Sequence, residues 1–209
     1  MTAMAFADVF TSALRGAPCK VVGLHADDAP LPVHGWSRPA SDVDRQVLRH
    51  CVGATIDIGC GPGRMSCHLA STGHVVLGID LVAEAVTQAR ARGVSALRRS
   101  VFELLPGEGR WDTALLADGN IGIGGNPVAL LRRVRQLIAL DGRVVCDLAD
   151  PGTGLRTRVA HLECVGERSR TFPWSLVAPE ALADVAGRAG LVVEQVHHVE
   201  GRWFGVLTR

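Results

Sequence analysis

The stretch TIDIGCGPGR, residues 55–64, decides the fold of this chain. Its apolar run, residues 55–58, stops at three glycines that alternate with single residues, Gly59, Gly61 and Gly63. Because glycine has no Cβ atom, its backbone can lie close against a bound molecule. The stretch therefore predicts a strand that turns through glycine into a helix, with a ligand held at the turn.

Short apolar runs alternate with helical segments from residue 54 to the end of the chain. Strands are expected at residues 54–58, 75–79, 95–101, 113–117, 143–148, 191–198 and 203–208, and helices at 64–72, 83–92, 127–140 and 179–189. This alternation predicts an α/β fold in which helices cover both faces of a parallel sheet. Glu200-Gly201 joins the last two strands without a helix, which predicts a hairpin and one antiparallel strand.

Two segments lie outside this alternation. Residues 16–40, rich in proline and small residues, are expected to form a loop-dominated N-terminal cover behind an amphipathic first helix. Residues 150–178 form an insertion after the fifth strand, in which 156–174 is a candidate strand pair that acts as a lid. Both segments flank strands of the sheet, so both can cross its carboxyl edge.

The composition limits the class of protein. With 209 residues and 47% hydrophobic content, the chain fits one domain. The formal net charge is +1 and the arginines are scattered, which disfavours nucleic acid as a partner. No apolar stretch of about 18 residues is uninterrupted, so no membrane span is expected. The N-terminus also lacks the early basic region of a secretory signal.

The cysteines show no metal-binding or redox pattern. They contain no C-x-x-C pair, and they stand at Cys19, Cys51, Cys60, Cys67, Cys146 and Cys164. We therefore expect six free thiols, no bound metal and a cytoplasmic location.

The glycine turn favours one class of ligand. A dinucleotide fingerprint, G-x-G-x-x-G, would place its third glycine at position 64, which is Arg64. Asp57, two residues before the turn, suits a cationic group, which it would contact directly or through a water. Asp80 ends the next strand, where a carboxylate can accept hydrogen bonds from a ribose diol. S-adenosylmethionine carries both an amino-acid cation and a ribose.

IDIGCGPGR followed by GID, residues 56–64 and 78–80, resembles the signature of the class I S-adenosylmethionine-dependent methyltransferases, and the resemblance extends over residues 41–209. It implies a Rossmann-like, seven-stranded sheet, mostly parallel with an antiparallel last strand, and S-adenosyl-L-methionine as the cofactor. It also implies the cofactor contacts: the methionine end at Asp57, Gly59, Cys60, Gly61 and Gly63, the ribose at Asp80, the adenine at Leu81, Ser100 and Val101, and the sulfonium side at Asp118 and Gly119. Ser100 departs from the family, which often has an acidic residue there.

The acceptor side follows from the chemistry of methyl transfer. Alignment supplies most of what an in-line displacement at a sulfonium needs, and a poorly acidic acceptor also needs a base. His34 in the cover is the candidate base, with His25 nearby, and Asn120 after the fourth strand would orient the acceptor. The side chains expected to enclose the acceptor are Trp36, Phe172 and Trp174.

These features predict a single methyltransferase domain over residues 1–209. Its parts are N-terminal helices and a cover loop in 1–50, a cofactor-binding half in 51–150 and an acceptor-side half in 151–209. The predicted activity is methyl transfer from S-adenosylmethionine to a small-molecule acceptor. The alternatives are an NAD-dependent oxidoreductase, which Arg64 disfavours, and a non-catalytic module that binds S-adenosylmethionine. The sequence leaves open the acceptor, its reacting atom and the oligomeric state.

Overall fold

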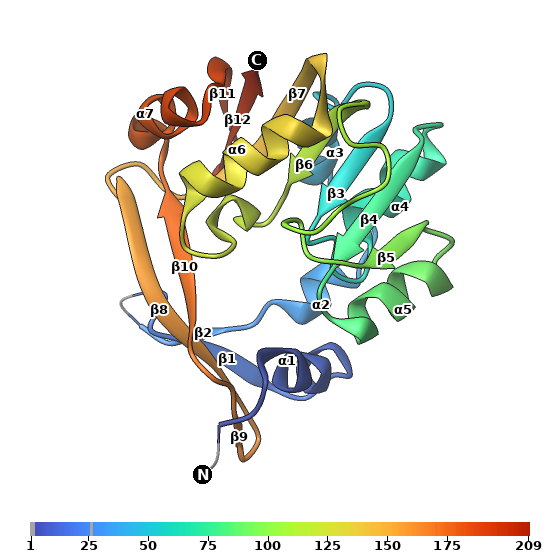
Figure 1. Cartoon of the computed structure of the whole chain (residues 1–209). Helices are drawn as coiled ribbons and strands as arrows, with labels where there is room; N and C mark the ends of the chain where they lie inside the picture. The colour runs from blue at the N-terminus through green and yellow to red at the C-terminus, as the bar shows by residue number, and fades with distance from the viewer. Residues whose placement is uncertain (1–2, 26) are drawn as a thin grey trace.

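The structure, a computed structural model, describes residues 3–25 and 27–209 and contains two β-sheets (Figure 1). The larger sheet has seven strands in the order β11-β12-β7-β6-β3-β4-β5. Their bounds are β3 (Thr55–Ile58), β4 (Val76–Asp80), β5 (Ala96–Arg98), β6 (Trp111–Leu116), β7 (Ile138–Leu148), β11 (Val192–Val199) and β12 (Arg202–Thr208). Strands β3 to β7 pair in parallel, whereas β12 is antiparallel to both β7 and β11. The predicted Rossmann-like sheet with one antiparallel strand is confirmed.

Helices cover both faces of this sheet, as the alternation predicts. They are α3 (Asp42–Leu48), α4 (Arg64–Ser71), α5 (Ala83–Ala91), α6 (Pro127–Leu137) and α7 (Pro179–Ala189). Leu115 and Leu116 are neighbours in β6, yet Leu115 packs with α3 and α4, whereas Leu116 packs with α6 and α7. Neighbouring side chains of a strand point to opposite faces, so each leucine is buried under a different layer of helices. Within residues 3–25 and 27–209, every helix is too short or too polar to reach across a bilayer.

The helix predicted at 127–140 ends earlier than expected. It begins behind Asn126, whose side chain accepts a hydrogen bond from the Ala129 N–H at 3.0 Å. It ends at Leu137, because Ile138 takes an extended conformation and pairs with Trp111 of β6. Ile138 is fully buried in this position. The burial of its side chain therefore starts β7 at residue 138 rather than at the predicted 143.

The second sheet joins the two segments that lie outside the alternation. Its strands are β1 (Cys19–Val22), β2 (Ala29–Pro30), β8 (Leu155–Cys164), β9 (Glu167–Arg168) and β10 (Phe172–Val177), in the order β10-β8-β1-β2 with β9 paired to β8. The expected strand pair at 156–174 is confirmed by β8 and β10. The loop-dominated cover expected at 16–40 is wrong in part, because this segment contributes two strands and the short helix α2 (Val33–Trp36). Figure 1 shows β1 and the first helix, α1 (Phe6–Leu14), beside β8 at one end of the molecule.

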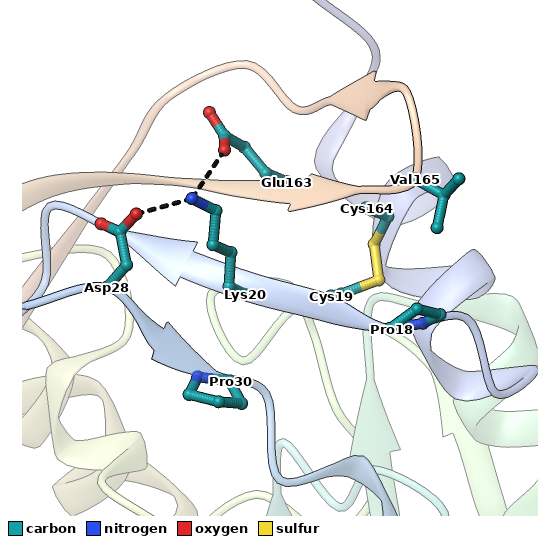
Figure 2. A pocket seen from close by; sticks show the side chains of 8 residues that line it. All are labelled: Pro18, Cys19, Lys20, Asp28, Pro30, Glu163, Cys164 and Val165. Atoms are coloured by element: carbon teal, nitrogen blue, oxygen red, sulfur yellow. Dashed lines mark hydrogen bonds and ion pairs between the residues drawn. A yellow bond between two sulfur atoms is a disulfide. The ribbon is translucent and has the colours of Figure 1, made fainter.

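A disulfide joins Cys19 to Cys164, so the prediction of six free thiols is wrong (Figure 2). The two cysteines lie directly opposite each other in the antiparallel pair of β1 and β8, with their Cα atoms 4.2 Å apart. They are separated by 145 positions in the chain. Local spacing gave no sign of the pair, because only the formation of the second sheet brings the cysteines together. The cytoplasmic assignment loses the support that it drew from reduced thiols.

We expect four reactive thiols when the protein is denatured without a reductant, and six after reduction. The thiols expected to react first are those of Cys51, Cys60, Cys67 and Cys146. Closing so long a loop restricts the unfolded chain, so the disulfide is expected to stabilise the fold by about 4–5 kcal/mol. Thiol titration and thermal unfolding with and without reductant measure both effects. Six reactive thiols in the unreduced protein would contradict the pairing.

Candidate active site

The glycine turn connects β3 to α4, and its three glycines meet different surroundings. All have left-handed φ angles: +73° at Gly59, +53° at Gly61 and +89° at Gly63. A Cβ atom at Gly59 would lie 2.6 Å from the amide nitrogen of Asn120, and one at Gly63 would lie 3.1 Å from a side chain of α5. A Cβ atom at Gly61 would meet no atom within 4 Å. Gly61 therefore borders open space, whereas the missing Cβ atoms of Gly59 and Gly63 let Asn120 and α5 pack closely against the turn.

Asp80 ends β4 and links that strand to the glycine turn. Its carboxylate accepts hydrogen bonds from the N–H groups of Gly61 and Val82, at 3.0 and 2.8 Å. Each carboxylate oxygen has two acceptor positions, so both can accept a further hydrogen bond from a ligand. Burial raises the pKa of Asp80 above its usual range. The side chain holds acceptor oxygens beside the turn, where the sequence predicts the ribose.

The side chains of two residues predicted to contact the methionine end lie on the buried side of the turn. Asp57 is 1% exposed and accepts a hydrogen bond from Ser66 Oγ at 2.6 Å. Burial raises the pKa of Asp57 to about 7. Cys60 is also buried, and its Sγ lies 2.8 Å from where a Cβ atom of Gly78 would stand. For Asp57, this placement favours an indirect effect on a cation over direct contact.

The residues predicted for the adenine follow β4 and β5. Leu81 is 56% exposed, although it is a large apolar side chain. Phe102, which the sequence analysis did not select, is 52% exposed. Ser100 Oγ accepts a hydrogen bond from the Phe102 N–H at 3.2 Å, and Val101 is buried. Exposed apolar side chains after two neighbouring strands offer surface for a flat apolar ligand group. Phe102 directly follows Ser100 and Val101 in the sequence, and this position was the signal that could have identified it as an adenine contact.

After β6, the chain presents Asp118, Gly119 and Asn120 at the carboxyl edge of the sheet. Asp118 and Gly119 both have left-handed φ angles, 52° and 78°. The Asn120 side-chain nitrogen donates to the carbonyl oxygens of Ile58 and Gly59, at 2.8 and 3.0 Å. Asn120 thus holds the end of β3 in place. Because the side-chain nitrogen is engaged in these hydrogen bonds, the side-chain oxygen is the atom of Asn120 that would orient an acceptor, the role predicted from the sequence.

A cavity of about 310 Å³ opens beside Asp118. Its lining comes from both sheets and includes Leu24, His25, Asp118, Asp147, Asp150 and Trp174. Neither Asp147 nor Asp150 was predicted from the sequence, although Asp147 is the last residue but one of β7, the strand next to β6, and Asp150 lies two residues after that strand ends. Open α/β sheets bind ligands at the carboxyl ends of their strands. A wider depression of about 510 Å³ lies beside the disulfide, but no residue predicted for the site lines it (Figure 2).

The predicted acceptor residues are distributed unevenly around this cavity. Trp174 in β10 lines it. Phe172 packs edge-on against Trp174, with ring centroids 6.3 Å apart, and also against α1. Trp36 packs against an aromatic ring of α1, with centroids 5.8 Å apart, and does not line the cavity. His34 is exposed on the same short helix and does not line the cavity. His25, in the loop after β1, does line it.

Residues 55–142 match a family model described as a methyltransferase domain. This chain carries a methyltransferase domain. The match begins at β3 and contains the glycine turn, Asp80 and Asp118. The resemblance found in the sequence motif is therefore confirmed. No curated protein sequence matches the chain.

Solved methyltransferases share the fold of this chain. An S-adenosylmethionine-dependent methyltransferase from Bacteroides fragilis, in complex with S-adenosyl-L-homocysteine, is similar over 97% of this chain and 93% of its own, with 20% identity and a TM-score of 0.82. The CcbJ methyltransferase from Streptomyces caelestis covers 83% and 92%, with 19% identity and a TM-score of 0.64. The 1,6-didemethyltoxoflavin-N1-methyltransferase from Burkholderia thailandensis covers 83% and 79%, with 21% identity and a TM-score of 0.61.

Proposed function

We propose that this methyltransferase transfers a methyl group from S-adenosylmethionine to a small-molecule acceptor. One observation carries the proposal. Inside the matched domain, the glycine turn borders open space at Gly61, and Asp80 presents carboxylate oxygens beside that space. Backbone without a Cβ atom admits close approach, and a carboxylate at this strand end suits a ribose diol. When bound, the cofactor supplies a sulfonium whose methyl carbon is the electrophile.

Each predicted contact then has a role in holding the cofactor. Gly59, Gly61 and Gly63 shape the backbone around its methionine part, and Asp80 accepts the ribose hydroxyls. Its adenine would lie against the exposed apolar surfaces of Leu81 and Phe102, with Ser100 and Val101 at its edge. The buried side chains of Asp57 and Cys60 would act from the inner side of the turn. Asp118 and Gly119, which line the cavity, would face the methyl group.

The cavity beside Asp118 is the proposed acceptor site. Its volume of about 310 Å³ suits a small molecule rather than a polymer. Trp174 gives it one aromatic wall, and the second sheet supplies the chain segments that cover it. The acceptor-side half predicted from the sequence, residues 151–209, therefore needs residues of the N-terminal cover, such as Leu24 and His25, to complete the site.

The charges of the cavity favour an amine as the acceptor group. Its lining residues in the described part of the chain include Asp118, Asp147 and Asp150 but no lysine or arginine. Arg64 and Arg202 pair with Asp118 and Asp147 from outside the lining, but with Asp44 and Asp150 included the carboxylates still outnumber the guanidinium groups. The nitrogen lone pair attacks the methyl carbon as the carbon–sulfur bond breaks, which leaves positive charge on nitrogen that nearby carboxylates stabilise. His25 at the cavity, rather than His34, is then the better placed group to take the proton. One structural neighbour is an N1-methyltransferase.

A comparison of matched acceptors tests this proposal. We expect 2-phenylethylamine and related primary and secondary amines to support formation of S-adenosylhomocysteine. A carboxylate of similar size, 3-phenylpropionate, should react at least about tenfold more slowly, because the lining carboxylates repel it. Faster turnover of the carboxylate would contradict the amine assignment. Oxidation of the amine with reduction of NAD⁺, and no turnover of S-adenosylmethionine, would contradict the whole proposal.

Replacing Trp174 by alanine is expected to lower kcat/KM for an amine acceptor by about tenfold or more. The substitution removes an aromatic wall of the cavity and leaves the glycine turn intact. The affinity for S-adenosylhomocysteine should change less than about threefold. Trp203→Ala is the matched control, because Trp203 stacks on His198 in the terminal hairpin and does not line the cavity. Equal losses in both variants would remove Trp174 from the acceptor site.

A further inference from the structure

Arg64 has no role in the proposed cofactor contacts, although it directly follows the glycine turn. It is the first residue of α4, and its side chain is only 12% exposed. One guanidinium nitrogen, Nη2, donates to both carboxylate oxygens of Asp118, at 2.7 and 2.6 Å. The other terminal nitrogen, Nη1, pairs with Asp44. A single side chain therefore connects the glycine turn to a carboxylate of the cavity.

Asp44 fixes Arg64 from the opposite side. Asp44 is 1% exposed and accepts hydrogen bonds from the N–H and Oγ of Ser41, at 2.8 and 3.0 Å, in the capping box that starts α3. Burial opposes ionisation of Asp44, but Ser41 and the guanidinium groups of Arg64 and Arg202 together hold its pKa below the usual range. Arg64 thus pairs with the ionised, buried carboxylate of Asp44. Asp44 cannot move away without losing its hydrogen bonds from Ser41 and its ion pair with Arg202.

Arg202 of β12 completes the network. Its guanidinium pairs with Asp44 and with Asp147, and its Nη2 lies 3.5 Å from an oxygen of Asp118. Burial alone would lower the pKa of Arg202, but its interactions with Asp147, Asp118 and Asp44 raise that pKa above its usual range. The network brings side chains of α3, α4, β7 and β12 to Asp118, the second residue after β6.

Asp118 needs this support because of its backbone. Its φ angle of 52° lies in the left-handed region, which a non-glycine residue keeps only when its surroundings hold it. Its N–H donates to the carboxylate of Asp147, and its own carboxylate is gripped by Arg64. Asp118 also lines the acceptor cavity. The direction of its carboxylate relative to an acceptor is therefore set by groups outside the cavity.

We propose that Arg64 is a positioning residue that fixes the Asp118 carboxylate at the acceptor cavity and ties it to the glycine turn. The proposal rests on the proposed function, since it takes Asp118 to face the acceptor. Arginine suits this role because the two ends of its planar guanidinium reach two carboxylates at once. Lysine keeps the charge but offers one ammonium group in place of the fork. Asp44 and Arg202 hold Arg64 and Asp118 in register.

Arg64→Lys, Asp118→Asn and the double variant test this proposal. With 2-phenylethylamine as the probe acceptor, Arg64→Lys should lower kcat by about tenfold, while the affinity for S-adenosylhomocysteine changes less than about threefold. In the Asp118→Asn background, the same substitution should lower kcat by less than about twofold, because the group that Arg64 positions is already gone. Arg92→Lys is the matched control, since Arg92 donates to the Pro62 carbonyl in the same turn and does not contact Asp118.

Amide hydrogen exchange provides a readout that needs no acceptor. Arg64→Lys should speed exchange in residues 118–122 by about tenfold, and Arg92→Lys should not. Additive effects on kcat, equal effects of the two arginine variants, or unchanged exchange in 118–122 would each overturn the proposal. If the unsubstituted protein does not turn over any amine, the amine assignment fails, and hydrogen exchange alone decides whether Arg64 fixes Asp118. A loss of thermal stability in Arg64→Lys with equal losses of kcat in the unsubstituted and Asp118→Asn backgrounds would show a purely structural role and also overturn the proposal.

Discussion

Replacing Gly61 by valine is expected to weaken the binding of S-adenosylhomocysteine by more than about 100-fold, which corresponds to about 2.7 kcal/mol. Gly61 has a left-handed φ of +53°, and a Cβ atom there would enter space that no protein atom occupies within 4 Å. A valine side chain would therefore fill the volume assigned to the cofactor. It would also disturb the N–H that donates to Asp80 at 3.0 Å. Isothermal titration calorimetry measures the loss directly.

Gly73→Val provides the matched control for this variant. Gly73 also has a left-handed φ, +92°, and a Cβ atom there would likewise meet no atom within 4 Å. It follows α4 and lies outside the glycine turn, so valine causes comparable backbone strain without entering the site. We expect Gly73→Val to lower the unfolding temperature and to keep its affinity for S-adenosylhomocysteine. Normal affinity in Gly61→Val would show that the cofactor does not lie against the turn.

The ligand-free Asp57→Asn variant is expected to gain stability over the unsubstituted protein as the pH rises. Burial raises the pKa of Asp57 from 3.8 to about 7, so the folded protein pays for ionising this carboxyl above the pKa of the unfolded chain. Stability linked to Asp57 is therefore present near pH 4 and is lost as the pH approaches 7. At about 1.36 kcal/mol per pKa unit, the advantage of asparagine should grow by roughly 2–3 kcal/mol between pH 5 and pH 7.5.

Urea unfolding of both proteins at these two pH values measures the difference. The asparagine side chain keeps an oxygen that can accept the hydrogen bond from Ser66 Oγ, so the variant removes mainly the buried charge. Asp141→Asn, at an exposed position, controls for the loss of one carboxyl group. If the stability difference between Asp57→Asn and the unsubstituted protein stays constant with pH, burial does not raise the pKa of Asp57. If Asp57→Asn gains stability but binds the cofactor more weakly, the ionised Asp57 carboxylate contributes to cofactor binding although it destabilises the ligand-free fold.

The features that the sequence predicts correctly are those with a local physical cause. Alternating apolar runs and helical segments predict the seven-stranded sheet, because each element carries its own periodicity. Glu200-Gly201 predicts the terminal hairpin, and both residues adopt left-handed φ angles, 47° and 82°, as a tight turn requires. The glycine turn and Asp80 are likewise read from short stretches whose backbone geometry is set by their own residues.

The features that the sequence does not predict depend on contacts between distant segments. Cys19 and Cys164 become neighbours only when β1 pairs with β8. Arg64 signalled in the sequence only that a dinucleotide pattern was absent, because its partners Asp44 and Asp118 lie on other elements. A local sign of Asp44 did exist, since residues 41–44, SDVD, fit a capping box. The capping box would have predicted α3, but not the ion pairs that its carboxylate forms.

Calorimetric titration with S-adenosylhomocysteine, with NADH as the competing ligand, tests the central claim most directly. The account predicts saturable binding of one S-adenosylhomocysteine per chain and no binding of NADH. It also predicts that Asp80→Ala weakens the binding at least about tenfold, because hydrogen bonds from the ribose hydroxyls to a carboxylate are lost. Binding of NADH without S-adenosylhomocysteine, or an affinity for S-adenosylhomocysteine that Asp80→Ala leaves unchanged, would contradict it.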